Sequence, residues 1–130
     1  SSSVLSKIAG HDHRVHRILK GTGSDLAAAD LEFYQELMRS RSHIGATMQM
    51  MAQWNLEPLL ARLPSLQTEI HLIASSNDLA VPCATSEKAA ALLPNAEYQI
   101  LPDLGHLAHE EDAATIATCI APLLDLGDAS

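Results

Sequence analysis

The sequence predicts an α/β fold in which a short parallel sheet follows a purely helical segment. From residue 69 onward the pattern alternates strand, helix, strand and helix, which is typical of a parallel sheet with helices packed on it. Before residue 55 the apolar residues recur at helical spacing, without a strand pattern. Hydrophobic residues make up 47% of the chain, which favours a folded core over disorder.

The first half of the chain consists of helical patterns separated by breaks. Apolar residues recur at spacings of three and four, and glycine, serine or proline interrupts them. Asp30 and Ser42 are expected to cap the second and third helices, because both side chains can accept a hydrogen bond from a first helical turn. Helices are therefore predicted over residues 4–19, 30–38, 42–54 and 58–63.

The second half contains two short apolar runs that predict strands, residues 69–74 and 98–101. An alanine-rich helix, residues 83–93, is expected between them, and a last helix over residues 111–124. Two strands cannot bury both faces of a parallel sheet. The chain is therefore expected to need the N-terminal half of a larger fold, or to associate with itself.

Charge and hydropathy argue against two kinds of partner. The formal charge is −8, and residues 63–130 carry ten acidic side chains against Lys88 alone, so a nucleic-acid partner is not expected. No apolar run approaches the length of a membrane span, and no signal peptide is recognised at the start. Cys83 and Cys119 form no disulfide framework, which fits a reducing compartment, so we expect a cytoplasmic protein.

An acid and a histidine follow the two predicted strands. Asp78 comes just after the first strand, and His106 comes just after the second. The carboxyl ends of parallel strands share one edge of the sheet, where sites form. A carboxylate that accepts from one imidazole nitrogen fixes the tautomer and leaves the other nitrogen as a base. Without a motif around them, a turn aspartate and a loop histidine are more often structural, so the neighbouring sequence decides.

The sequence around both residues resembles the last two core strands of the α/β-hydrolase family. Residues 70–82 read Ile-His-Leu-Ile-Ala-Ser-Ser-Asn-Asp-Leu-Ala-Val-Pro, like the family's strand, acid and Val-Pro. Residues 101–106 read Leu-Pro-Asp-Leu-Gly-His, like its later strand and Gly-His. The resemblance implies that Asp78 is the acid of a catalytic triad and His106 its base. Ser75 departs from the glycine that is usual there.

The same resemblance implies how the chain is divided. Residues 1–55 correspond to the helical cap, or lid, and residues 56–130 to the C-terminal part of the α/β-hydrolase core. The family's nucleophile sits in a Gly-x-Ser-x-Gly elbow, and no pair of glycines here brackets a serine in that way. The family's order places that elbow before residue 1. The chain is therefore expected to be a C-terminal fragment of a serine-type hydrolase, inactive alone.

A narrower resemblance concerns one subgroup of that fold, the magnesium-chelatase accessory proteins of bacteriochlorophyll synthesis. It rests on residues 17–24, 50–56 and 105–111. It implies a small apolar or ester-like substrate, or a porphyrin. The residues expected to line the substrate pocket are Met48, Met51, Trp54, Leu79 and Leu107. Two alternatives remain, a non-catalytic scaffold that binds a porphyrin or assists the chelatase, and an unrelated capped esterase-type hydrolase.

No metal ion or cofactor is expected. His11, Asp12, His13 and His16 have a spacing that suits a metal site on a helix, but a zinc site needs three or four convergent ligands. A solvated helix surface is the favoured interpretation of this segment. The Gly-Thr-Gly sequence at residues 21–23 lacks the third glycine of a dinucleotide-binding loop and follows no strand.

Overall fold

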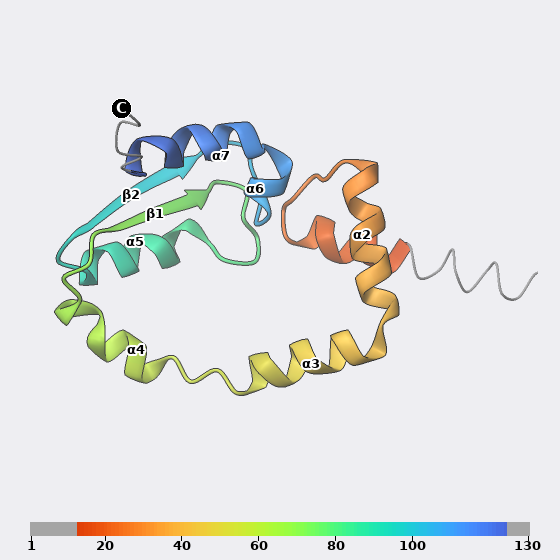
Figure 1. Ribbon diagram of the computed structural model, residues 1–130, viewed down its shortest axis with the longest axis horizontal. Coiled ribbons are helices and arrows are strands. Elements are labelled where there is room, and N and C mark those ends of the chain that lie inside the picture. Colours follow the sequence, from red (N-terminus) through yellow and green to blue (C-terminus); the bar gives the residue numbers. More distant parts are fainter. Residues whose placement is uncertain (1–12, 125–130) are drawn as a thin grey trace, which may run out of the picture.

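The computed structural model describes residues 13–124, a mixed α/β structure in which helices precede a two-stranded parallel sheet (Figure 1). The first described helix covers residues 13–21. The later elements are α2 (Ala28–Arg39), α3 (Arg41–Ala52), α4 (Glu57–Arg62), η1 (Leu63–Ser65), β1 (Ile70–Ser75), α5 (Cys83–Leu92), β2 (Ala96–Leu101), α6 (Ala108–Glu111), α7 (Ala113–Ile120) and η2 (Ala121–Leu123).

Residues 13–55 contain helices and connecting turns and no strand, as the apolar spacing predicts. The part of the first predicted helix before residue 13 lies outside the described residues. Helices of this segment lie beside α6, near the end of the sheet at which both strands finish (Figure 1). The division of the chain into a cap, residues 1–55, and a core, residues 56–130, stays a prediction.

Two helices begin at residues other than those expected. α2 begins at Ala28, so Asp30 lies inside its first turn. There the negative carboxylate interacts favourably with the positive end of the helix dipole. Ser40 caps α3 in place of Ser42, because its Oγ accepts a hydrogen bond of 3.3 Å from the His43 N–H. Ser40 is the single residue between α2 and α3, so the chain has no room for a longer loop.

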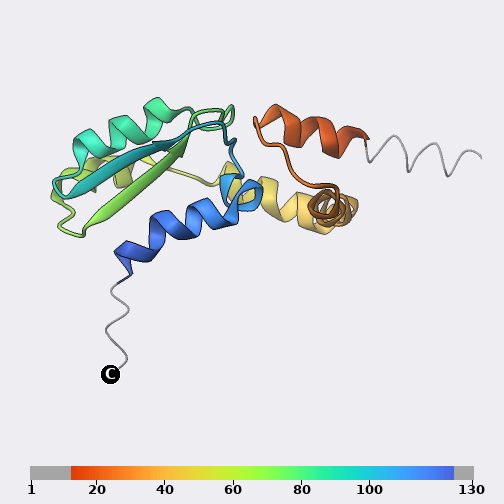
Figure 2. The same ribbon diagram turned by 90° about the horizontal axis from the view of Figure 1, so that it is seen from above.

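β1 and β2 pair in parallel, with Ile70 opposite Ala96 and Ser75 opposite Leu101. β2 begins two residues before the expected start at residue 98. α5 lies on one face of the sheet and α7 on the other (Figure 2). Because Ser75 and Leu101 are partners, the loops that follow the two strands leave the sheet at the same edge.

The last predicted helix is interrupted at Asp112. This residue has φ −145° and ψ 74°, which are not helical values, and it separates α6 from α7. Its carboxylate accepts from the Thr115 hydroxyl at 2.6 Å and from the Thr115 N–H at 3.0 Å, and these bonds lower the pKa of Asp112. Asp112 therefore caps α7 and starts it in a new direction.

The core of the described residues is small. The buried apolar residues are Val15, Leu19, Ala74, Leu93, Leu101 and Ala108. Among residues 13–124 no large side chain is completely buried, and several are strongly exposed, such as Phe33 at 71% and Ile100, on β2, at 50%. The two-stranded sheet thus leaves apolar surface exposed, as its strand number implies.

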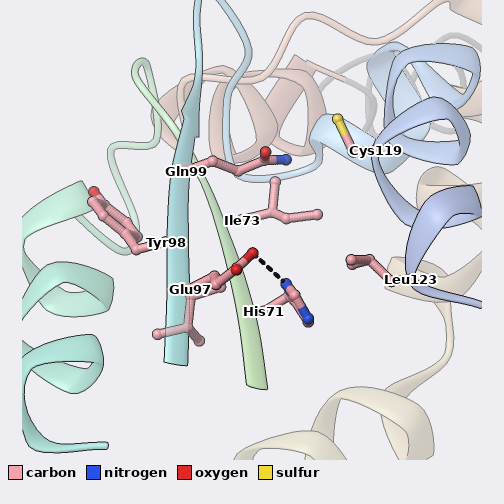
Figure 3. Close-up of a pocket in the computed structure, with 8 residues that line it drawn as sticks. His71, Ile73, Glu97, Tyr98, Gln99, Cys119 and Leu123 are labelled. Carbon is pink, nitrogen blue, oxygen red and sulfur yellow. Dashed lines mark ion pairs between the residues drawn. The ribbon is translucent and has the colours of Figure 1, made fainter. Parts of the chain in front are cut away.

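A cavity of about 100 Å³ lies between the sheet and the C-terminal helices (Figure 3). Its wall includes Cys119 of α7 and the side chain of His71. His71 lies between two carboxylates, with Nε2 2.8 Å from Glu69 and Nδ1 3.2 Å from Glu97. This cavity lies on a face of the sheet, away from the loops that follow the strands, so it is separate from the predicted Asp78–His106 site.

Candidate active site

The side chains of Asp78 and His106 meet at the carboxyl edge of the sheet. His106 Nδ1 lies 2.9 Å from Asp78 Oδ2, within hydrogen-bond distance. Asp78 follows a tight turn after β1, and His106 lies in the loop between β2 and α6. The contact that the strand order predicts is therefore present in the structure, and the catalytic roles of the two residues stay a prediction.

The surroundings of Asp78 favour its ionised form. Its Oδ1 accepts hydrogen bonds from the backbone N–H groups of Ala80, at 2.9 Å, and Val81, at 2.7 Å. Burial by itself raises the pKa of Asp78, but the bonds from Val81, His106 and Ala80 outweigh it, and the pKa lies below its usual value. Since an ionised Asp78 can only accept, Nδ1 of His106 carries the proton, and Nε2 is left to act as a base.

The acid and the base differ in exposure. The Asp78 side chain is 12% exposed and the His106 side chain 39%. This difference suits an arrangement in which the carboxylate is shielded from water while the imidazole reaches a substrate.

A cavity of about 360 Å³ lies against this pair. Apolar side chains of the sheet and of the following elements form much of its wall, namely Ile73, Ala74, Val81, Ala108 and Ile116. Asp78 and His106 contribute its ionisable groups, together with His109 of α6. Apolar walls combined with convergent polar groups are typical of a small-molecule site.

Hydrogen bonds hold the loop that carries Asp78, residues 76–82 (the acid loop), against the loop that carries His106, residues 102–107 (the histidine loop). The N–H groups of Ser76 and Asn77 donate to the carbonyl oxygens of Leu101 and Leu104, both at 2.9 Å. Asp103 has a left-handed backbone with φ 62°, and its N–H donates to the Ser76 hydroxyl at 2.8 Å. Asp residues tolerate this backbone conformation better than most. The two loops are therefore joined by hydrogen bonds next to Asp78 and His106.

The five residues predicted to line a substrate pocket do not line this cavity. Met48 and Met51 lie on α3 and Trp54 follows it, and their exposed fractions are 62%, 48% and 60%. α3 runs along the side of the molecule away from the sheet (Figure 1). Leu79 is 69% exposed, and Leu107 is half-buried at the start of α6. Their part in substrate binding stays a prediction.

Two residues near the site were not recognised from the sequence as part of it. Ser24 is 3% exposed, and its Oγ accepts from the N–H of Leu107. Glu111 accepts from the N–H of Gly105. Both residues lie in segments that carry the subgroup resemblance, but the sequence assigns them no part in the site, only a helix break at residues 21–24 and an acidic helix start at Glu111. The glycines of the break are a signal that could have indicated a close approach of backbones, because glycine has no Cβ.

Neither a metal centre nor a membrane-spanning helix is found among the residues that the structure describes. Within residues 13–124 no group of three or more His, Cys, Asp or Glu side chains is placed to hold a metal ion. Two members of the histidine-rich segment, His11 and Asp12, lie outside the described residues. No described helix has the length and apolar character needed to cross a bilayer.

Comparison with known proteins finds a relative that aligns with nearly the whole chain. No protein-family profile matches it. It is 34% identical over 125 residues to a protein of Rhodobacter capsulatus named magnesium-chelatase 30 kDa subunit. The alignment covers 96% of this chain and 44% of that relative, so the chain spans less than half of the relative's length. Over nearly all of its residues the chain is thus similar in sequence to a magnesium-chelatase 30 kDa subunit.

Proposed function

We propose that the chain supplies the acid and the base of a hydrolytic site of the α/β-hydrolase type, in a protein related to the magnesium-chelatase 30 kDa subunit. The observation that carries the proposal is the 2.9 Å contact between His106 Nδ1 and Asp78 Oδ2 beside a cavity of about 360 Å³. The substrate class proposed is a small molecule with an ester or another activated carbonyl group.

The chemistry of each group follows from its surroundings. His106 Nε2 takes the proton of a serine hydroxyl as that hydroxyl attacks the carbonyl carbon, and it later gives the proton to the leaving group. Asp78 stays ionised and stabilises the imidazolium that forms between these two steps. The low pKa of Asp78 suits this role, because the carboxylate then keeps its charge at neutral pH.

The nucleophile is proposed to come from residues outside these 130. No Gly-x-Ser-x-Gly elbow occurs in the chain. The relative is more than twice as long as the segment that aligns, since the alignment covers 44% of it. The exposed apolar surface of the sheet supports the same proposal, because further strands beside β1 and β2 would cover it.

Residues 1–55 are proposed to form a cap over this site. Two contacts support the assignment within the described residues. Tyr34 of α2 donates to Glu110 at 2.6 Å, and the N–H of Asp25 donates to Glu111 at 2.7 Å. Both acceptors lie on α6, which begins two residues after His106. The helical segment therefore packs beside the proposed catalytic base.

A fluorophosphonate tests the hydrolytic proposal, because it reacts covalently with activated serine nucleophiles. We expect the native protein to be labelled at a serine outside residues 1–130 and to hydrolyse a p-nitrophenyl ester. In the His106→Ala variant, labelling should be lost and kcat should fall by about 10³-fold or more. His43→Ala is the control, since His43 is an exposed histidine of α3.

Two results would contradict the hydrolytic proposal. One is a native protein that is neither labelled nor active on any activated ester. The other is labelling of a serine that persists unchanged in His106→Ala.

A second candidate is a non-catalytic scaffold that binds a porphyrin or assists the chelatase. The observations that favour it are the name of the relative and the exposed apolar side chains of Met48, Met51 and Trp54. Trp54 is the one tryptophan of these 130 residues, so in the 130-residue chain its fluorescence reports on that surface directly. Saturable quenching by a free-base porphyrin, equal in wild type and His106→Ala, supports this candidate.

The control for the quenching experiment is free tryptophan amide at the same porphyrin concentrations, which corrects for light absorbed by the porphyrin. Quenching that does not exceed this control would contradict porphyrin binding at the α3 surface.

A further inference from the structure

We infer that the turn at residues 22–25 and the carboxylate of Glu111 position the Asp78–His106 pair, with Ser24 and Glu111 as the positioning side chains. The kinetic part of this inference rests on the proposed hydrolytic function. The structural part concerns only how the two loops are held and is tested independently of turnover.

The carbonyl oxygen of Thr22 contacts both loops at once. It accepts a hydrogen bond of 3.0 Å from the N–H of Leu79, the residue after the acid. It also accepts one of 3.3 Å from the N–H of His106 itself. A carbonyl oxygen has two lone pairs, so one atom can serve both donors. The backbone beside Asp78 and the backbone of His106 are thereby held at a fixed separation.

Glu111 ties the same turn to the residue before the histidine. Its Oε1 accepts from the N–H of Asp25, and its Oε2 accepts from the N–H of Gly105, both at 2.7 Å. Hydrogen bonds to an ionised carboxylate are shorter and stronger than neutral ones. Because the two oxygens belong to one rigid group, a shift of the turn would pull on Gly105 directly.

Ser24 completes the contact on the other side of His106. Its hydroxyl oxygen accepts from the N–H of Leu107 at 2.8 Å, and Ser24 is 3% exposed, so water does not compete for this bond. Three consecutive backbone N–H groups, those of Gly105, His106 and Leu107, are therefore bonded to the turn or to Glu111. This stretch of backbone has little freedom to rotate the imidazole away from Asp78.

Two glycines allow the three loops to approach this closely. A Cβ atom on Gly23 would lie 1.7 Å from the carbonyl oxygen of Asn77, in the acid loop. A Cβ atom on Gly105 would lie 2.3 Å from the carbonyl carbon of Gly23. Gly23 also has φ 83°, a left-handed value that favours glycine. The turn, the acid loop and the histidine loop thus touch backbone to backbone.

The turn belongs to the helical segment, while Asp78 and His106 belong to the loops of the sheet. The hydrogen bonds of the 22–25 turn therefore make the geometry of the pair depend on how the helical segment is attached. Displacement of the turn by about 1 Å would misplace the imidazole, and misplacements of that size cost roughly 10²-fold in rate.

Nuclear magnetic resonance of the histidine nitrogens in the native protein tests the structural part. In the wild type we expect the neutral His106 ring to carry its proton on Nδ1, as the bond to Asp78 requires. Glu111→Ala and Ser24→Ala should shift the ring towards the tautomer mixture shown by Asp78→Ala, in which no side chain at position 78 bonds to Nδ1. Where activity is present, kcat should fall by about 10²-fold while KM changes little.

Matched variants separate positioning from general effects on charge or folding. Glu110→Ala removes the same charge from the same helix, but Glu110 accepts from the Tyr34 hydroxyl and bonds to neither loop, so the His106 tautomer should stay as in wild type. Ser24→Thr restores a hydroxyl and should restore the tautomer. Glu111→Gln keeps the shape of the side chain, and it decides the test if Glu111→Ala does not fold.

The outcomes distinguish this inference from the proposed function. If folded Ser24→Ala and Glu111→Gln variants both keep the wild-type His106 tautomer, the positioning inference is wrong and the hydrolytic proposal is unaffected. If the wild type hydrolyses nothing, the proposed function is wrong, and the tautomer comparison still decides whether the turn positions His106.

Discussion

The hydroxyl of Tyr34 donates a hydrogen bond of 2.6 Å to Glu110, which joins α2 to the short helix that follows His106. Burial, the hydrogen bond to Glu110 and the negative charges of Glu110 and Asp30 together raise the pKa of Tyr34 to about 12, with burial the largest cause. The bond exists only while Tyr34 keeps its proton, since a tyrosinate beside a carboxylate would be repelled.

The pH dependence of this contact gives a first prediction. Because the folded pKa is raised above 10.0, the stabilisation is complete below pH 10.0 and is lost as the pH rises towards about 12. Urea midpoints measured across this alkaline range should fall with pH for the wild type and fall less steeply for Tyr34→Phe. Equal pH slopes in the two proteins would show that the contact does not contribute to stability.

Asp78 gives the opposite dependence on pH. Its folded pKa is lowered from 3.8, so its stabilisation is complete above that value and is lost as the pH falls through the folded pKa. In Asp78→Asn the acid-side loss of stability should be smaller. Asp103→Asn is the matched control, because Asp103 lies in the neighbouring loop with a backbone conformation that Asn tolerates. If Asp103→Asn reduces the acid-side loss of stability as much as Asp78→Asn does, the loss cannot be attributed to Asp78.

Replacing Gly23 and replacing Gly45 by alanine should change the free energy of unfolding in opposite directions. Gly23→Ala places a Cβ against the Asn77 carbonyl oxygen at positive φ, and it should lower the free energy of unfolding by about 1–3 kcal/mol or more. Gly45 lies inside α3, and a Cβ there meets nothing within 4 Å. Gly45→Ala should therefore stabilise the protein by about 0.5–1 kcal/mol. Urea unfolding measures both, and similar effects would contradict the close approach at Gly23.

The 130-residue chain studied alone should have no hydrolase activity and should self-associate. It lacks a nucleophile elbow, and it leaves large apolar side chains such as Ile100 exposed. Light scattering should report a mass above that of one chain, and p-nitrophenyl ester turnover should equal the buffer blank. Turnover that disappears in His106→Ala, with a labelled serine inside residues 1–130, would overturn the prediction.

Local patterns were enough to predict the strands and the contact between Asp78 and His106. Each strand is a short apolar run, and each of the two residues follows its strand in the loop at the carboxyl end. Parallel pairing then brings the two loops to one edge whatever the rest of the chain does. Strand order and loop position therefore predict that the two side chains come within hydrogen-bond reach, and the structure places them 2.9 Å apart.

The contacts of the 22–25 turn could not be predicted in this way, because the partners are distant in the sequence. Ser24 and Leu107 are 83 residues apart, and no periodic pattern relates them. Glu111 resembled an ordinary acidic residue at a helix start, and its bonds to two backbone N–H groups depend on the tertiary arrangement. The separate helix α6 was missed because residues 109–112 carry no apolar pattern, and the bonds of Asp112 to Thr115 begin a new helix after it.

The turn at residues 22–25 makes two of its contacts through main-chain atoms, the Thr22 carbonyl and the Asp25 N–H. Exchanging the side chain at either position leaves these atoms where they are. Inserting or deleting one residue in the turn would move every one of them relative to His106. The number of residues between the two helices is therefore, together with Gly23 and Ser24, the feature to preserve when this helical segment is shortened, fused or transplanted onto another sheet.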